Sequence, residues 1–546
     1  MKIFNELSLG NLRGDLFGGV TAAIVALPLA LAFGVASGAG PIAGLWGAIA
    51  VGFFAALFGG TPSQISGPTG PMTVVMTAVV MKYAHDPAMA FTVVIMGGAL
   101  QVLFGVLRLG RFVSLVPFTV ISGFMSGIGC IIILLQVAPL LGQPGPGGGT
   151  IGALRALPDL VAGVHWDALA VGALSLAIVT LCPASISRRL PSPLIALVAG
   201  TALVWTVLPG APVLGDIPQG LPQVHLPTLG WEALPDMLGS ALVLALLGAI
   251  DSLLTSLIAD NVTGTSHDSD QELIGQGIGN LVAGLIGGIP GAGATMRTVV
   301  NVRAGGRTAV SGIVHAVVLV AVVLGLGGLA GHIPHAVLAG ILFKVGYDII
   351  DWPFLRVALR APREGVVVML LVLVLTVFVD LIIAVGVGVA AASLLMVHRM
   401  SVLQLETIRA GDGGFGEMPL SDDEHARLQA LAGRVLYVHF GGPVTFAAAK
   451  GLTKRLVVGS HHTVIILDMT GVTFVDTSAA FAVGEVVAKA QERGVRVLVA
   501  GLRAPVAQVL DRLGILKPVA AEDRFARHDE AIAAAEALGG GAGDAA

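Results

Sequence analysis

A long series of apolar runs determines the class of this chain. Between about residues 14 and 399 the runs recur at close to the roughly 20 residues that a helix needs to cross a ~30 Å hydrocarbon core. We count about fourteen of them, at approximately 15–38, 41–59, 61–82, 88–107, 112–140, 166–184, 191–209, 234–260, 272–289, 290–305, 309–330, 334–352, 364–380 and 381–398. Only 12% of the 546 residues are charged, against about 25% in soluble domains. The sequence therefore predicts a polytopic α-helical membrane protein in a lipid bilayer.

Two of the predicted spans are broken by Gly- and Pro-rich segments, residues 66–72 and 290–296. Non-helical backbone at membrane depth has unsatisfied N–H and C=O groups, and it is tolerated only where these groups line an enclosed cavity. Each segment leads directly into helix-forming residues, so we expect two half-helix spans whose first halves are extended. A pair of broken spans in the two halves of a chain marks the central site of a transporter. We therefore expect a carrier whose substrate lies between the two breaks.

The distribution of basic residues predicts the orientation, because cytoplasmic loops are enriched in Lys and Arg. If the N-terminus is cytoplasmic and the number of spans is even, most arginines between the spans lie in inner loops. These are Arg108, Arg111, Arg188, Arg189, Arg303, Arg307, Arg356, Arg360, Arg363 and Arg399. We expect both termini in the cytoplasm and a multi-pass protein of the cell's inner (plasma) membrane. The net charge of −4 gives no indication of nucleic-acid binding.

The composition changes after the last apolar run. We expect a transmembrane domain over 1–400, a polar linker over 401–430, and a soluble domain over 431–546 whose Gly- and Ala-rich end is disordered. The expected strands of the soluble domain are 434–440, 462–469 and 495–500, and its expected helices include 478–493 and 504–513. This alternation is typical of a small sheet with helices packed against it.

Asp251 is the ionisable residue of greatest interest inside a predicted span. A carboxylate in the membrane interior costs about 2.5–3.5 kcal/mol on insertion scales, which makes it a candidate functional residue. Thr255 follows one helical turn later on the same face, so the two side chains can converge on one ligand. Oxygen ligands favour a hard cation, Na⁺ above all, with carbonyls of the broken spans completing the shell. The alternative is a structural Asp251 that hydrogen-bonds neighbouring helices.

The two broken spans supply an anion site. In the first, Thr69 or Gly70 is at a helix N-cap with Pro71 at the first helical position, where the missing N–H has no cost. In the second, residues 293–295 open a helix that runs toward Arg303. Each helix N-terminus has free N–H groups and about half a positive charge, so two that face each other can bind an anion. The alternative is two Gly/Pro kinks in packed helices.

A count of charges favours a monovalent anion. Two helix N-termini contribute roughly +1, and a bound Na⁺ cancels ionised Asp251. One monoanion then leaves the cavity near neutral, whereas a dianion leaves an excess charge that is costly to bury. Arg297, inside the second helix, adds a charge if it faces the site and none if it extends toward the cytoplasm. The count does not choose between bicarbonate, nitrate and chloride.

Several stretches resemble the SulP family of anion transporters. They are residues 11–15, 18–23, 30–40, 68–78, 248–257, 267–270 and 290–298, while 467–479 resembles STAS domains. The resemblance covers nearly the whole chain and is greatest with bicarbonate-transporting members. It implies a seven-plus-seven inverted repeat and an elevator-like movement of a core domain against a gate domain. The implied core is about 15–107 and 234–330, and the implied gate is about 112–209 and 334–398.

The resemblance also implies the ligands of the site. The implied Na⁺ ligands are Asp251, Thr255, Gly293 and Thr295, and the candidate anion-binding residues are Thr69, Gly70, Ala294 and Thr295, with Arg297 as an additional candidate. Gly67 is a departure, since we expect an acidic residue there in a bicarbonate-transporting relative, and selectivity or pH dependence is expected to differ. A glutamate at position 251 is associated with H⁺-coupled members, so Asp251 favours Na⁺.

We therefore predict a secondary active transporter, not an enzyme, that couples the transport of Na⁺ to that of a small monovalent anion. Bicarbonate is the favoured substrate. Alternatives within this class are carriers of sulfate, a dicarboxylate, chloride or nitrate, or coupling to H⁺. A membrane-anchored STAS signalling receptor is the alternative from another class, with Ser478 as its phosphorylation site. The structural role for Ser478 is a helix N-cap. The family implies a homodimer through the STAS domain, and we expect no cofactor besides the coupling Na⁺.

Overall fold

The computed structural model describes residues 5, 9–113, 117–146, 148–187, 190–215, 221–228, 230, 232–379, 381–412, 418–446, 449 and 461–540. The chain divides into two compact units, Met1–Ala392 and Ser393–Ala546. The tail that we expected to be disordered, at 541–546, lies outside the described residues.

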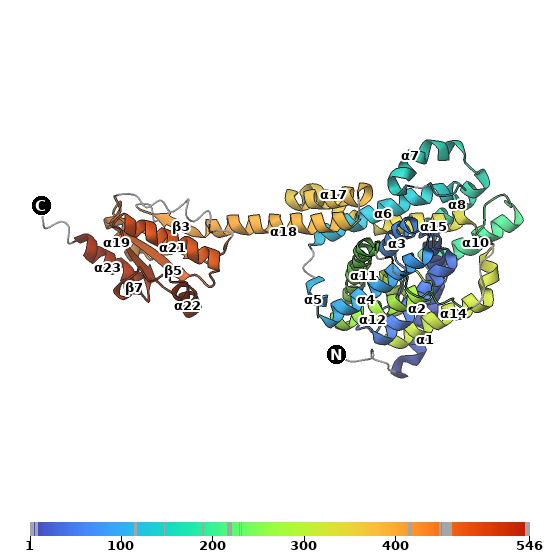
Figure 1. Ribbon diagram of the computed structural model, residues 1–546, viewed down its shortest axis with the longest axis horizontal. Coiled ribbons are helices and arrows are strands. Elements are labelled where there is room, and N and C mark those ends of the chain that lie inside the picture. The colour runs from blue at the N-terminus through green and yellow to red at the C-terminus, as the bar shows by residue number, and fades with distance from the viewer. Residues whose placement is uncertain are drawn as a thin grey trace. The chain divides into compact units, whose positions relative to one another are not determined.

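The first unit is helical apart from two short strands (Figure 1). Its elements up to residue 285 are η1 (Leu9–Asn11), α1 (Leu12–Ala36), α2 (Pro41–Phe58), β1 (Ser66–Gly67), α3 (Gly70–Lys82), α4 (Pro87–Val106), α5 (Gly110–Val113), α6 (Phe118–Leu140), α7 (Gly149–Ala162), α8 (Trp166–Leu181), α9 (Ala184–Ser187), α10 (Ser192–Thr206), α11 (Leu234–Thr263) and α12 (Ser269–Leu285). There follow β2 (Ala292–Gly293), α13 (Thr295–Arg303), α14 (Ala309–Ala330), α15 (His335–Ile349), α16 (Trp352–Val357), η2 (Ala358–Arg360), α17 (Arg363–Phe378) and α18 (Leu381–Glu406), which continues into the second unit.

Several of these helices are suited to a bilayer. Among the described residues, six are long and apolar enough to cross a membrane: α1, α2, α4, α6, α11 and the part of α18 from Ile383 to Glu406. Helices α7 and α8, bent by 117° at their junction, would count together as a seventh. Helices α3 and α10 are apolar but shorter, as is the Ala309–Gly325 part of α14. The multi-pass helical class is thus confirmed, whereas the count of fourteen spans stays a prediction.

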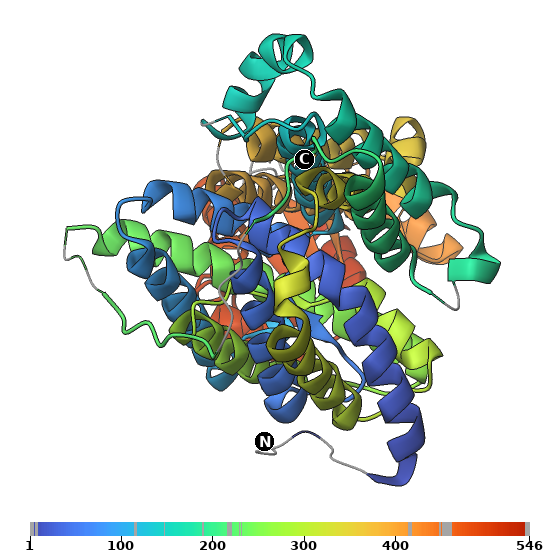
Figure 2. The same cartoon turned by 90° about the vertical axis from the view of Figure 1, so that its right-hand side faces the viewer.

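The helices of the first unit pack as two groups (Figure 2). In the first helix group, α1, α2 and α4 pack against α11, α12 and α14, and in the second, α6 and α8 pack against α15, with α17 and α10 beside them. Glycines allow close backbone contact in both. A Cβ atom on Gly98 of α4 would lie 2.6 Å from the carbonyl oxygen of Gly277 of α12, and one on Gly129 of α6 would lie 2.5 Å from that of Gly346 of α15. Small residues at such contacts hold helices together in lipid.

The second unit is a five-stranded sheet in the order β3 (Ile408–Gly411), β4 (Val435–Gly441), β5 (Val464–Gly471), β6 (Arg496–Ala500) and β7 (Arg524–Phe525). Strand β3 is antiparallel to β4, and the other neighbours are parallel. Its helical elements are α19 (Asp422–Ala430), α21 (Thr477–Glu492), α22 (Ala504–Arg512), η3 (Ala521–Asp523) and α23 (His528–Gly540). The predicted small sheet with helices is therefore confirmed.

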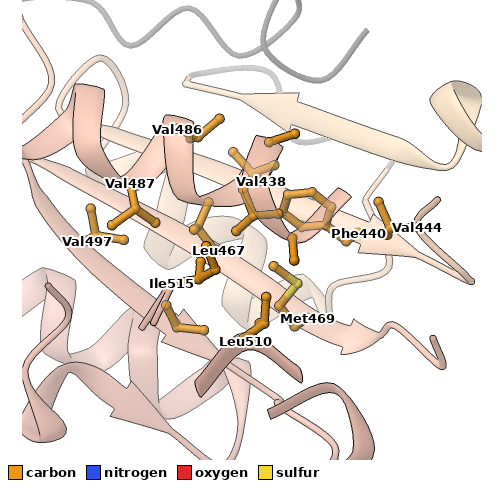
Figure 3. Close-up of a cluster of buried hydrophobic side chains, with 14 of the residues drawn as sticks. Val438, Phe440, Val444, Leu467, Met469, Val486, Val487, Val497, Leu510 and Ile515 are labelled. Atoms are coloured by element: carbon orange, nitrogen blue, oxygen red, sulfur yellow. The ribbon is translucent and has the colours of Figure 1, made fainter. Parts of the chain in front are cut away.

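The strands of this sheet are apolar on both faces, because successive side chains point to opposite sides. On one face, Val438, Leu467 and Val497 pack against side chains of α21 and α22, as Figure 3 shows. On the other, Ile466 and Leu498 pack in a separate cluster with side chains of α19 and α23. Helices thus cover both faces and remove them from water.

The segment that we predicted as a linker, 401–430, contains regular structure. Helix α18 continues to Glu406, Ile408–Gly411 forms the edge strand β3, and Asp422–Ala430 forms α19. A capping box starts α19, because the Ser421 hydroxyl accepts from the Glu424 backbone N–H while the Glu424 carboxylate accepts from the Ser421 N–H. The Ser-x-x-Glu pattern that signals this start was present in the sequence.

Candidate ion-binding site

The two breaks meet in the structure. Strands β1 and β2 pair antiparallel, with Ser66 opposite Gly293 and Gly67 opposite Ala292. Each strand leads into a helix, α3 at Gly70 and α13 at Thr295, as the sequence predicted. Because the two strands are antiparallel, the segments that follow them leave the strand pair at opposite ends. The N-termini of α3 and α13 therefore flank the same strand pair. Sequence segments more than 200 residues apart thus form one site.

Helix α11 fixes β2 through two hydroxyl side chains. Ser252 Oγ accepts from the Gly293 backbone N–H at 3.0 Å, and Thr255 Oγ1 donates to the Gly293 carbonyl oxygen at 3.0 Å. Thr255 Oγ1 also lies 2.9 Å from Thr295 Oγ1. Three of the four implied Na⁺ ligands, Thr255, Gly293 and Thr295, are therefore in direct contact, and all three offer an oxygen.

Asp251, the fourth implied ligand, lies one turn earlier on α11 and lines a cavity. The cavity is also lined by Pro71 of α3 and Leu254 of α11, by side chains of α6, including Phe124, and by Val385 of α18. Among the described residues that line this cavity, Asp251 is the one with a charged side chain. Site residues of the first helix group therefore face the second helix group across an apolar gap.

The N-cap of α3 presents a second oxygen to this region. Thr69 is at the N-cap and its side chain makes no capping hydrogen bond. It lies beside the Asp251 side chain. Within the described part of the chain, Thr69 Oγ1 and Asp251 Oδ2 are both buried and have no hydrogen-bond partner. A buried polar atom without a partner is costly, and such atoms at one place are what a polar ligand requires. Gly70 contributes the first residue of α3, and Ala294 is the N-cap of α13.

Arg297 faces inward rather than toward the cytoplasm. Its side chain is 2% exposed, and Nη2 donates to the carbonyl oxygen of Pro68. Among the described residues, Nη1 has no hydrogen-bond partner. Gly67 is directly adjacent, because a Cβ atom on it would lie 2.6 Å from Nη1. The sequence did not determine the direction of the Arg297 side chain. In the structure its positive charge lies beside the first break.

A buried carboxylate that we did not select from the sequence accepts hydrogen bonds from residues next to the first break. Glu272 of α12 is 1% exposed and accepts four hydrogen bonds, from the backbone N–H groups of Gly60 and Thr61 and from the amides of Gln64 and Gln276. Gln276 also donates to Ser66 Oγ at 2.6 Å. The signal in the sequence was a polar stripe on α12, since Glu272, Gln276 and Asn280 recur every four residues in an apolar run.

The expected N-cap role of Ser478 is wrong. Asp476 is the N-cap of α21, and its carboxylate accepts from the Ala479 backbone N–H at 2.8 Å. Ser478 lies within the first turn and is exposed. A buried cluster lies nearby in the sequence, where Asp468 accepts hydrogen bonds from Tyr437 and Thr470 and lies 2.7 Å from His439 Nδ1. Burial alone would raise the pKa of Asp468, but these partners outweigh it and lower the pKa to about 2.

Known proteins are similar to this chain in sequence and in fold. Residues 12–372 match the Sulfate permease family, and residues 430–531 match the STAS domain. The bicarbonate transporter BicA of Picosynechococcus sp. is 46% identical over 543 residues, which cover 97% of this chain and 96% of that protein. The solved transmembrane domain of a cyanobacterium bicarbonate transporter BicA is 56% identical and covers 70% of this chain and 100% of its own, with a TM-score of 0.67. The structure of SLC26A9 covers 97% of this chain and 91% of its own at a TM-score of 0.84 and 18% identity, which is a likeness of fold alone.

Proposed function

This chain belongs to the sulfate permease family and has a C-terminal STAS domain, and from that premise we propose that it is a secondary active transporter in which Na⁺ drives uptake of a small monovalent anion. Bicarbonate is the first candidate, because two of the similar proteins described above, BicA of Picosynechococcus sp. and the solved BicA transmembrane domain, are named bicarbonate transporters and match 97% and 70% of this chain. Its relatives are transporters, and we assign it no enzymatic activity.

The observation that carries the proposal is the meeting of three oxygens beside Asp251. The Thr255 hydroxyl lies within hydrogen-bond distance of both the Gly293 carbonyl oxygen and the Thr295 hydroxyl, where α13 begins. Hard oxygen ligands and a carboxylate suit Na⁺. The N-termini of α3 and α13 beside them suit an anion. A cation and an anion bound at adjacent places would each favour the binding of the other, which is the basis of symport.

The charges at the site support a monovalent anion once Glu272 is included. The two helix N-termini contribute about +1, Arg297 contributes +1, and Asp251 and Glu272 contribute −1 each. Glu272 accepts four hydrogen bonds, a pattern that suits an ionised carboxylate because that group only accepts. The sum is near zero before ions bind, so one Na⁺ and one monoanion leave it unchanged. The inward charge of Arg297 is offset by Glu272.

A dianion is the second candidate substrate, and one observation favours it. Nη1 of Arg297 is buried and has no hydrogen-bond partner among the described residues, so it can meet a second negative charge. If Glu272 binds a proton, the sum of charges rises by one and sulfate or a dicarboxylate becomes the better match. Chloride, nitrate and H⁺ coupling through Asp251 are the remaining alternatives of this class.

The cavity beside Asp251 supports an elevator-like movement. It separates α3 and α11, which carry site residues, from α6 and α18. We propose that the first helix group is the core domain, that the second is the gate domain, and that the core carries Na⁺ and the anion past the gate. The seven-plus-seven repeat, the inner-membrane location with cytoplasmic termini and the homodimer stay predictions.

Transport in proteoliposomes tests the proposal. Uptake of labelled bicarbonate is measured at fixed pH and membrane potential with and without an inward Na⁺ gradient, and sulfate uptake is measured in parallel. We expect Na⁺-dependent bicarbonate uptake that Asp251→Asn abolishes. Asp236→Asn is the matched control, because Asp236 is also on α11 but forms an exposed ion pair with Lys82.

Two results would contradict the assignment. Bicarbonate uptake that is the same with and without the Na⁺ gradient would exclude Na⁺ symport. Sulfate uptake without bicarbonate uptake would show that the substrate is a dianion. A protein that transports no anion, but whose phosphorylation at Ser478 changes with an extracellular ligand, would support the signalling receptor instead.

A further inference from the structure

Two histidines and an aspartate meet at one edge of the sheet in the second unit. Asp412 follows β3, and His461 and His462 precede β5. Gly411 pairs with Tyr437, and Val435 pairs with Val464. Because β3 is antiparallel and β5 parallel to β4, the end of β3 and the start of β5 lie at the same edge.

The backbone around the cluster is fixed by the sheet. The Gly433 N–H donates to the Asp412 carbonyl oxygen at 2.5 Å, and the Thr463 N–H donates to the Arg434 carbonyl oxygen at 2.8 Å. These bonds connect the residue after β3 and the residue before β5 to the turn that precedes β4. The three side chains therefore start from ordered backbone positions.

The spacing of the ligand atoms matches that around a small cation. His461 Nε2 and His462 Nε2 lie 3.7 Å and 3.6 Å from the same oxygen, Asp412 Oδ2, and one ligand atom from each of the three residues lies within 4.8 Å of the others. Ligands at about 2.0–2.1 Å from a tetrahedral Zn²⁺ are about 3.4 Å apart. A direct hydrogen bond would be shorter, at about 2.9 Å. The atoms are thus close to the positions that a shared ion requires.

The chemistry of the ligands selects the class of ion. Two imidazole nitrogens and one carboxylate oxygen suit Zn²⁺ and its first-row neighbours better than Mg²⁺ or Ca²⁺, which take oxygen ligands. The side chains of His461 and Asp412 are more than half exposed, so water can reach the remaining coordination position.

We propose that Asp412, His461 and His462 bind a divalent cation of the Zn²⁺ and first-row transition-metal class, with Zn²⁺ as the favoured ion. The ion would join the edge strand β3, which follows α18 in the chain, to the central strand β5. This site does not depend on the proposed transport function.

Metal binding by the full-length protein tests the inference. Protein without an affinity tag is stripped with a chelator, desalted and titrated with Zn²⁺ against a chromophoric chelator, and Co²⁺ is used to record the visible absorption of a tetrahedral site. We expect one Zn²⁺ per chain. His461→Ala and Asp412→Asn should weaken binding by about tenfold or more and remove the Co²⁺ band. His398→Ala, which removes an exposed histidine elsewhere, should bind as the unchanged protein does.

The controls separate a specific site from other losses. His461 is 59% exposed, so its truncation should leave the melting temperature of the metal-free protein unchanged. Absence of Zn²⁺ binding would overturn the proposal. So would binding that is equal in the unchanged protein and in His461→Ala, because the ion would then be adventitious or held by other histidines.

Discussion

The Arg297 guanidinium donates a hydrogen bond to the carbonyl oxygen of Pro68, so the second broken segment places its positive charge against the first. Pro68 is preceded by Gly67, whose φ of +153° favours glycine. A Cβ atom at position 67 would lie 2.6 Å from Nη1, which is buried and has no hydrogen-bond partner among the described residues. We infer that the absence of a side chain at position 67 keeps this charge available to an anion.

Gly67→Asp is predicted to weaken anion binding. The new carboxylate would lie beside Nη1 and neutralise it, and two unit charges about 4 Å apart interact by several kcal/mol at the effective dielectric near a protein surface. We expect the KM for the transported anion to rise about tenfold or more. Gly67→Asn is the matched control, because it has the same size and the same backbone strain without the charge. Equal KM values for the two variants would show that Arg297 does not contribute its charge to the anion.

The local structure of the two breaks could be predicted from the sequence because it is determined locally. Pro71 permits only the first turn of a helix, and the glycines before it disfavour helix. Helical periodicity likewise placed Asp251 and Thr255 on one face. Each of these inferences needed only residues that are close in the chain.

The remainder of the site depends on contacts between distant segments. The bond from Gln64 to Glu272 joins residues 208 apart, and the pairing of Ser66 with Gly293 likewise joins two segments that are distant in the chain. The polar stripe on α12 was visible, but nothing local showed which residues it meets. Strand β3 has four residues and is defined by its pairing with β4, so composition alone suggested a linker.

A cross-link over the cavity is predicted to stop transport. Leu254 of α11 and Phe124 of α6 line the same cavity and belong to different helix groups. In a protein with Cys130 and Cys182 replaced by Ala, Leu254→Cys with Phe124→Cys should be joined by a short bis-methanethiosulfonate reagent, which forms a reducible disulfide bond with each cysteine. We expect transport to fall at least tenfold and to return after reduction, because the two helix groups can no longer move past each other. The control pair, Val120→Cys with Phe124→Cys, lies within α6. Undiminished transport with the first pair fully cross-linked would contradict an elevator-like movement.

The second unit is predicted to lose stability in acid through Asp468. Its pKa is about 2 in the folded protein, against 3.8 for the unperturbed group. Because the folded pKa is the lower one, this stabilisation is present above about pH 4 and is lost as the pH falls toward 2. The shift corresponds to about 2 kcal/mol. Calorimetric unfolding should show this loss in the unchanged protein and a smaller pH dependence in Asp468→Asn. An identical pH dependence in both would show that the hydrogen bonds from Tyr437 and Thr470 do not depend on the charge.

Glu272→Gln tests whether the buried carboxylate belongs to the charge balance. Removing one negative charge makes the empty site positive by about one unit, so a monoanion can bind without Na⁺ and the cation is opposed. We expect the stimulation of bicarbonate uptake by Na⁺ to fall about tenfold and sulfate uptake to rise relative to bicarbonate. Glu364→Gln, an exposed change at the start of α17, is the control. Because glutamine replaces one acceptor by a donor opposite four donors, the melting temperature of the variant is measured first. A folded Glu272→Gln protein with unchanged Na⁺ dependence would show that Glu272 only positions β1, and the inward charge of Arg297 would then favour a dianion.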